Sequence, residues 1–130
     1  RLEPSDEEGV RQMGALLGLG DLVTNVNLAN RGQVENLPRD AVVETNARFS
    51  RDEVRPLAAG ALPPGLQPLM ARHVANQELI VEASLTRDRD LAFQAILGDP
   101  TNRLALDETW AMFLEMLRAS RAFLPGWRIE

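Results

Sequence analysis

The sequence contains no cysteine, no lysine and no tyrosine, and it has a single histidine. A chain without cysteine forms no disulfide, no thiolate metal site and no thiol nucleophile. This absence fits a reducing compartment, and we expect a cytoplasmic protein. No apolar run approaches the length of a membrane-spanning helix, and the first residues, RLEPSDEEGV, do not have the pattern of a signal peptide. The net charge of -5 argues against binding nucleic acid through bulk charge.

The length and composition are those of one globular domain. The chain has 130 residues and is 45% hydrophobic, which is enough to fill a core. We therefore expect a single domain over residues 1–130. The first residue is Arg1 rather than methionine, which suggests a fragment or a processed piece. Any chemistry of the longer protein would then lie partly in what was removed.

The first half predicts one helix followed by a small antiparallel sheet. Ser5 and the acids after it are typical of a helix start, and apolar residues at helical spacing continue to Leu17. Residues 22–28 and 54–58 are expected strands. Residues 41–49 alternate between apolar and polar side chains, which predicts a half-buried strand. The side chains expected to face the core are Ala41, Val43, Thr45, Ala47 and Phe49.

The second half predicts helices. A long helix is expected over residues 66–85, a second around residues 91–96, and a third that Asp107 would cap. The Thr86-Arg87-Asp88 segment favours a break followed by a new cap. The order of helix, strands and helices predicts an α+β fold.

Few residues suggest chemistry. His73 and Gln77 share a helix face with apolar neighbours, and polar groups on an apolar stripe need partners. His73 is therefore either a substrate contact in a cleft or a histidine satisfied in a core or an interface, and the second interpretation is favoured. Glu78 and Glu82 are also four residues apart, as acid/base pairs can be, but a solvated face is the favoured interpretation. No phosphate loop, zinc spacing or nucleophile elbow is present.

Arg31 lies in an Asn-Arg-Gly turn between two expected strands. A guanidinium at such a turn can bind a carboxylate or a phosphate with two parallel hydrogen bonds, or it can simply be solvated. From the turn alone, a solvated arginine is the favoured interpretation.

Three segments together resemble the C-terminal part of glycoside hydrolase family four. They are NLANRGQVENLPRDAVVE over residues 27–44, RPLAAGALP over residues 55–63, and QELIVEASLT over residues 77–86. The resemblance covers nearly the whole chain in one consistent order. It implies a fold like the C-terminal domain of lactate dehydrogenase, accompanied in the family by an N-terminal Rossmann domain that holds NAD and is absent from this chain.

The resemblance also implies a mechanism, which is an exception to two-carboxylate glycoside hydrolysis. In the family, NAD oxidises the sugar at C3, a base removes the acidified C2 proton, and a divalent metal, usually manganese, stabilises the enolate. The C1 substituent leaves by elimination, water adds, and the hydride returns. NAD and Mn²⁺ are thus implied for the full-length enzyme only. No metal ligand, NAD ligand or catalytic base of the family matches a residue of this chain, so we expect the isolated chain to bind neither and to be inactive.

The resemblance places the Asn-x-Gly stretch close to the sugar. Asn30, Arg31 and Gly32 are therefore candidate substrate contacts, together with His73. The asparagine amides would pair with hydroxyls or hold the loop that does. Phospho-sugar members often have a second asparagine at the position of Arg31. The segments VETNARFSRDEVRP and RHVANQE are more similar to members acting on α-galactosides, α-glucosides or uronic-acid glycosides.

Three functions follow as alternatives. The first is the C-terminal, substrate-covering and oligomerisation domain of an NAD- and metal-dependent glycosidase, with a sugar, its own Rossmann domain and other copies of itself as partners. The second is a non-catalytic oligomerisation module. The third, an independent small enzyme using His73, has little support, because a lone histidine lacks a partner acid or nucleophile.

Overall fold

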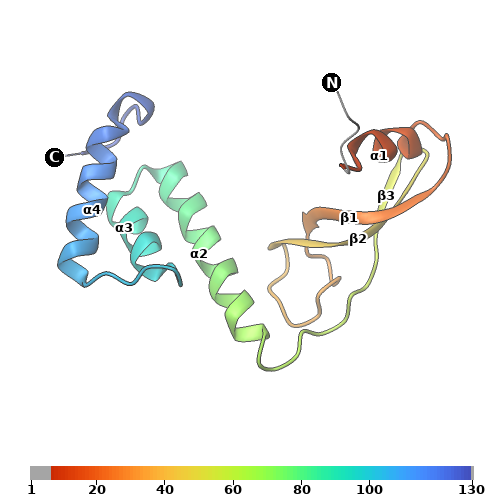
Figure 1. Cartoon of the computed structure of the whole chain (residues 1–130), viewed down its shortest axis with the longest axis horizontal. Helices are drawn as coiled ribbons and strands as arrows, with labels where there is room; N and C mark the ends of the chain where they lie inside the picture. Colours follow the sequence, from red (N-terminus) through yellow and green to blue (C-terminus); the bar gives the residue numbers. More distant parts are fainter. Residues whose placement is uncertain (1–6, 130) are drawn as a thin grey trace, which may run out of the picture. The chain divides into compact units, whose positions relative to one another are not determined.

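A computed structural model describes residues 7–129 of the chain (Figure 1). The chain divides into two compact units, the first ending at Gln67 and the second beginning at Pro68. The expectation of a single domain over residues 1–130 stays a prediction.

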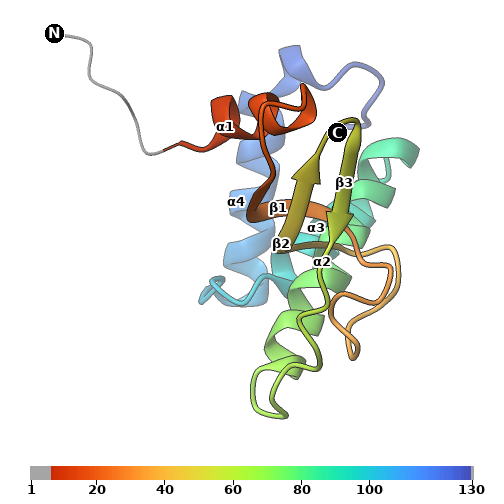
Figure 2. The same cartoon turned by 90° about the vertical axis from the view of Figure 1, so that its right-hand side faces the viewer.

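The first unit contains one helix and a three-stranded sheet. The elements are α1 (Gly9–Leu16), β1 (Leu22–Ala29), β2 (Val42–Ser50) and β3 (Glu53–Pro56). The strands lie in the order β1-β2-β3, and both neighbouring pairs are antiparallel. Figure 2 shows the opposite directions of β2 and β3. The predicted strands are confirmed to within a few residues at their ends.

The central strand carries the alternation that its sequence predicts. The five side chains expected to face the core are all buried, whereas the residues between them are exposed. Ala47 and Phe49 pack with Ala15 of α1, so the helix covers this face of the sheet. Burying the apolar face of a short sheet under a helix is what makes a three-stranded sheet stable.

The first helix begins later than predicted. Its described start is Gly9, and the Glu8 carbonyl accepts the first hydrogen bond, from Gln12 N at 2.9 Å. The expected cap, Ser5, lies outside the described residues. Glu7 and Glu8 precede the helix, and Glu8 makes no side-chain cap bond.

The second unit is helical. It consists of most of α2 (Gln67–Thr86), then α3 (Arg89–Gly98), α4 (Leu106–Ala119) and a short 3₁₀ turn η1 (Arg121–Phe123). The predicted break is confirmed, because Asp88 caps α3 by accepting from the backbone N–H groups of Asp90 and Leu91 at 2.9 and 3.1 Å. With this order of elements the predicted α+β class is confirmed.

The predicted cap of α4 is wrong. Ala105 is the N-cap residue, and Asp107 lies inside the first turn. The reason is the Glu108 carboxylate, which reaches back to accept from Ala105 N at 3.0 Å and satisfies one free backbone donor. Asp107 still suits the positive end of the helix dipole.

An aromatic cluster forms the core of the second unit. Phe113, Leu117 and Ile129 are buried, and Phe93 and Trp110 pack against them. The ring of Phe93 meets Trp110 edge to face, with centroids 4.6 Å apart. Such contacts add to the burial of apolar area and join α3 to α4.

The long helix α2 is less covered than its apolar spacing predicts. Val74 and Ala83 are its buried residues, whereas several large apolar side chains stay at least 45% exposed. The exposed ones are Leu69, Met70, Ile80, Val81 and Leu85. A helical period thus identified the element but not what packs against it.

Candidate functional site

The loop between β1 and β2 is built around the side chain of Asn30. This side chain is 1% exposed, and its amide nitrogen donates to the carbonyls of Val34, Leu37 and Pro38 at 2.9 to 3.1 Å. Its amide oxygen accepts from the backbone N–H groups of Gly32 and Val34, both at 3.1 Å. Of the two roles predicted for the asparagines, Asn30 performs the second: its amide holds the loop.

A second segment fastens the same loop to the rest of the first unit. The side chain of Asn36 donates to the carbonyl of Leu62 at 2.9 Å and accepts from its N–H at 2.8 Å. Ala59 N donates to the carbonyl of Gln33 at 2.7 Å, and Val34 forms a parallel bridge with Gly60. Because both ends and the middle of the loop are bonded, its exposed residues have a fixed backbone to project from.

Gly32 and Arg31 form the exposed rim of this loop. Gly32 has a φ of 121°, a conformation that side-chain-bearing residues rarely adopt, which accounts for the glycine. The Arg31 N–H donates to the side chain of buried Gln33, and its guanidinium pairs with the carboxylate of Asp40. The Arg31 side chain is 64% exposed and that of Asp40 is 61% exposed, so the pair faces solvent.

Sequence reasoning missed Asp40. The signal was its place next to the turn, directly after Pro38-Arg39 and before the alternating strand. Asp40 has a φ of 69°, in the left-handed region that aspartate tolerates better than most residues. The loop thus presents one arginine and one carboxylate side by side.

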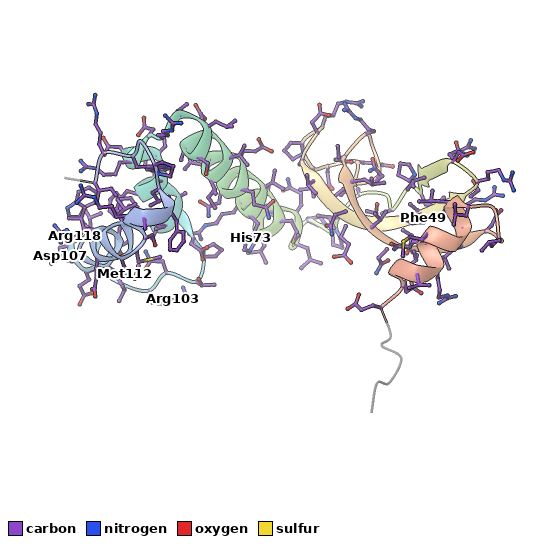
Figure 3. All side chains as sticks on the ribbon, turned by 90° about the horizontal axis from the view of Figure 1, so that it is seen from above. Phe49, His73, Arg103, Asp107, Met112 and Arg118 are labelled. Atoms are coloured by element: carbon purple, nitrogen blue, oxygen red, sulfur yellow. The ribbon has the colours of Figure 1, made fainter. Side chains whose placement is uncertain are left out.

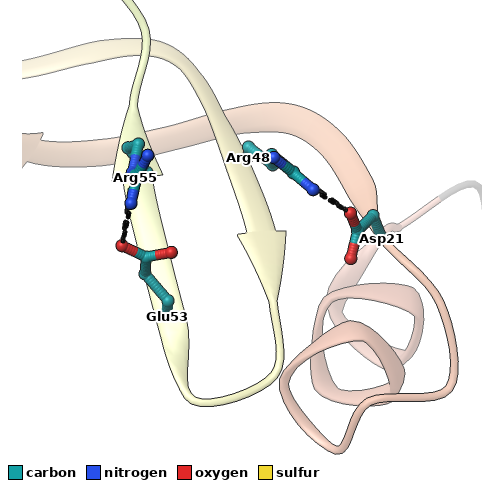
Figure 4. A network of polar contacts seen from close by, with 4 residues as sticks. All are labelled: Asp21, Arg48, Glu53 and Arg55. Atoms are coloured by element: carbon teal, nitrogen blue, oxygen red, sulfur yellow. Dashed lines mark hydrogen bonds and ion pairs between the residues drawn. The ribbon is translucent and has the colours of Figure 1, made fainter.

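Other exposed ion pairs in the same unit provide a comparison. Arg48 pairs with Asp21, and Arg55 pairs with Glu53 at 2.8 Å (Figure 4). The hydrogen bond that Arg48 donates to Asp21, and then the charge of Asp21, raise the pKa of Arg48 above its ordinary value. These two pairs lie on strands and at a strand end, whereas Arg31 and Asp40 both lie in the loop.

His73 lies on α2 and belongs to the second unit (Figure 3). Its side chain is exposed, as is that of Gln77. A core position for His73 therefore does not hold among the described residues. A contact with a substrate or at an interface stays a prediction. Glu78 and Glu82 are also exposed, as expected for a solvated face.

Next to His73 the end of α3 forms a polar turn. The carboxylate of Asp99 accepts from the hydroxyl and the backbone N–H of Thr101 at 2.6 and 2.7 Å. These bonds, and then the charges of His73 and Arg72, hold the pKa of Asp99 below its ordinary value. Arg72 itself donates twice to the carbonyl of Gly98, at 2.9 and 3.1 Å.

The second unit also contains an apolar cavity that the sequence did not predict. It has a volume of about 530 Å³ and lies among α2, α3 and α4. Its apolar walls include Ile80, Ile96, Leu104, Met112 and Met116, with Met112 labelled on α4 in Figure 3. Helical periodicity marks such residues as core, so it could not reveal that they line an open space.

Over residues 7–129, no three His, Asp or Glu side chains gather in a way that could hold a metal ion. Within the same range, none of the helices has the length and apolar character needed to cross a membrane. What the described chain offers is a rigid loop that displays a guanidinium, and a separate helix that displays an imidazole.

Comparison with known proteins identifies the family to which this chain is similar. Residues 1–102 match the family model for the family 4 glycosyl hydrolase C-terminal domain. An alpha-galacturonidase of Thermoanaerobacterium saccharolyticum is 50% identical over 129 residues, which are 99% of this chain and 28% of that protein. An alpha-galacturonidase of Bacillus subtilis is 53% identical over 88% of this chain and 26% of that protein.

Solved structures agree with the fold. A Bacillus subtilis protein superposes with a TM-score of 0.82 at 53% identity, covering 85% of this chain and 26% of that one. The 6-phospho-beta-glucosidase of Thermotoga maritima, solved with manganese, NAD⁺ and glucose-6-phosphate, gives a TM-score of 0.80 at 25% identity, over 88% of this chain and 28% of that one.

The chain therefore spans about a quarter of the length of these relatives. The resemblance stated from the sequence is confirmed in both order and extent. The chain belongs to the family 4 glycosyl hydrolases, of which it is the C-terminal domain.

Proposed function

We propose that this chain is the substrate-covering part of a glycosidase that hydrolyses O-glycosyl bonds by oxidation and elimination. The observation that carries the proposal is the rigid Asn-Arg-Gly loop, whose buried Asn30 amide fixes the backbone while Arg31 and Gly32 face outward. In this proposal Asn30 holds the loop, and Arg31 and Gly32 contact the sugar. His73 on α2 is a further sugar contact.

The cofactors belong to the whole protein. Relatives have been solved with NAD and manganese, but residues 7–129 lack a metal-ligand cluster. The residues present therefore do not fit the metal, and we assign it and NAD to the remaining three quarters of the protein, where we also expect the Rossmann domain. We expect the whole protein to be located in the cytoplasm.

The proposed substrate is a glycoside of a uronic acid. Arg31 has an exposed guanidinium, and arginine recognises a carboxylate with two parallel hydrogen bonds. Two relatives that match most of this chain are named alpha-galacturonidases. A neutral sugar would offer no carboxylate to the part of the guanidinium that Asp40 does not contact.

The test uses the full-length protein with NAD, Mn²⁺ and a reductant. Wild type should cleave an α-galacturonide in preference to the matching α-galactoside. Replacing the guanidinium by Arg31→Ala should raise KM for the galacturonide at least tenfold, since hydrogen bonds to charged groups are among the strongest in proteins. Unchanged turnover of the galacturonide in this variant would contradict the proposed substrate.

The second proposed function is oligomerisation. It is favoured by the row of exposed apolar side chains on α2. Exposed apolar patches on soluble domains often mark protein–protein contacts. This function is compatible with the first, because one domain can cover a substrate and contact another subunit with different faces.

A further inference from the structure

We propose that Asp40 is a positioning residue, which holds the Arg31 guanidinium in the orientation that receives the substrate carboxylate. This inference rests on the proposed function, because it concerns how the loop recognises a uronic acid. It adds a residue that acts through Arg31 rather than on the sugar itself.

The backbone fixes where Asp40 lies. Asp40 N donates to the carbonyl of Asn30 at 2.9 Å, and Asn30 N donates to the carbonyl of Ala41 at 2.8 Å. These two bonds close the loop at its base, next to the buried Asn30 amide. Asp40 is therefore brought beside Arg31 by the same bonds that define the loop.

The local conformation of Asp40 supports a specific role. Its φ of 69° is unfavourable for most residues with a side chain, whereas aspartate and asparagine tolerate it and glycine adopts it freely. A glycine would satisfy the backbone, but it would leave Arg31 without its ion pair.

One edge of the Arg31 guanidinium is available for a ligand. Arg31 uses Nη1 to contact Asp40 Oδ1. Within residues 7–129 its Nε and Nη2 make no hydrogen bond or ion pair. These two nitrogens form one edge of the planar fork, and such an edge can bind both oxygens of a carboxylate.

The value of the pair lies in orientation rather than stability. Both partners are more than 60% exposed, and exposed ion pairs stabilise folded proteins very little. An arginine side chain has many rotamers, however, and holding it in one of them removes an entropy cost from binding. Asp40 thus affects substrate affinity more than folding.

The decisive variant is Asp40→Asn in the full-length protein. Asparagine keeps the left-handed backbone and the size of the side chain while removing the charge. We expect KM for an α-galacturonide to rise about threefold to fivefold, which is the range that the energies of exposed pairs allow. The kcat for this substrate and the kinetics with an α-galactoside should change less than twofold, and the melting temperature should stay constant.

The matched control is Glu53→Gln. It breaks another exposed arginine–carboxylate pair of the same unit, that of Arg55, outside the loop. This variant should leave KM for the galacturonide unchanged. An equal rise in both variants would mean that general charge, not the position of Asp40, affects binding, and would overturn the inference.

A double-mutant cycle with Arg31→Ala separates the inference from the proposed function. If Asp40 acts through Arg31, Asp40→Asn should have no further effect once Arg31 is alanine. If Arg31→Ala leaves galacturonide KM unchanged, the proposed substrate is wrong. If Arg31→Ala raises KM but Asp40→Asn leaves it unchanged or lowers it, the positioning role alone is wrong.

Discussion

Asn30 shows how one buried amide can determine a whole loop. The side chain makes bonds to both ends of the loop, and every partner is a backbone group. A hydroxyl has a single donor and a carboxylate has none, so neither could donate to three carbonyls while accepting from two N–H groups. The asparagine is therefore explained by satisfaction of the backbone, independently of any sugar.

The Asn30→Ala substitution should destabilise the chain strongly. It leaves buried carbonyl and N–H groups without partners, and we expect a loss of about 3 kcal/mol in the free energy of unfolding. Urea unfolding followed by circular dichroism measures this directly. The control is Asn27→Ala on the exposed face of β1, which should change stability by less than about 0.5 kcal/mol. Similar losses in the two variants would refute the role given to Asn30.

The sequence indicated these residues but not their division of labour. Asn30, Arg31 and Gly32 were singled out together, and the structure brings them together on one loop. Composition could not show that Asn30 faces inward and Arg31 outward, because that difference depends on which carbonyls converge. Asp40 was missed for the same reason: its partner is nine residues away, across the closing bonds of the loop.

Among the elements, the polar turn after α3 gives a pH-dependent effect. Hydrogen bonds from Thr101, followed by the charges of His73 and Arg72, lower the pKa of Asp99. When the pKa of a carboxyl group is lower in the folded state than in the unfolded state, the group stabilises the folded state at every pH above its unfolded-state pKa. This stabilisation is lost as the pH falls through the folded-state pKa. The stabilisation is thus complete near neutrality and absent in strong acid.

Thr101→Val should remove part of this effect. Without the hydroxyl donor, the pKa of Asp99 should rise toward its ordinary value of 3.8. A titration of the carboxyl carbon by NMR measures the shift. The variant should be less stable than wild type at neutral pH, and the difference should shrink as the solution is acidified below the ordinary value. A stability difference that grew in acid would contradict the assignment.

The contact between α3 and α4 depends on its aromatic rings. Phe113 is 2% exposed and lies against both Phe93 and Trp110. Phe113→Ala should cost about 3 to 5 kcal/mol, since truncating a buried ring loses its burial and leaves a cavity. Phe123→Ala is the matched control, because that ring is 84% exposed and should contribute little. Thermal unfolding of both variants tests the difference.

Helices and strands were predictable because their periods are local. The alternation in residues 41–49 identified every buried position of β2. The start of α4 was not predictable, because the acid that satisfies the backbone is Glu108 rather than Asp107. The helical periodicity of α2 predicts a helix with an apolar face, but periodicity does not identify what packs against that face.

The uncovered face of α2 leads to a prediction for the chain as a molecule in solution. Several large apolar side chains of this helix are about half exposed or more. Exposing this much apolar surface to water is unfavourable. The isolated chain should therefore self-associate as its concentration rises. Replacing Met70 and Ile80 together by glutamate should shift it to monomer in sedimentation experiments. Val10→Glu is the control, because Val10 is 76% exposed on α1 in the other unit. Association that survived the double replacement, or that Val10→Glu abolished equally, would show that α2 is not the contact surface.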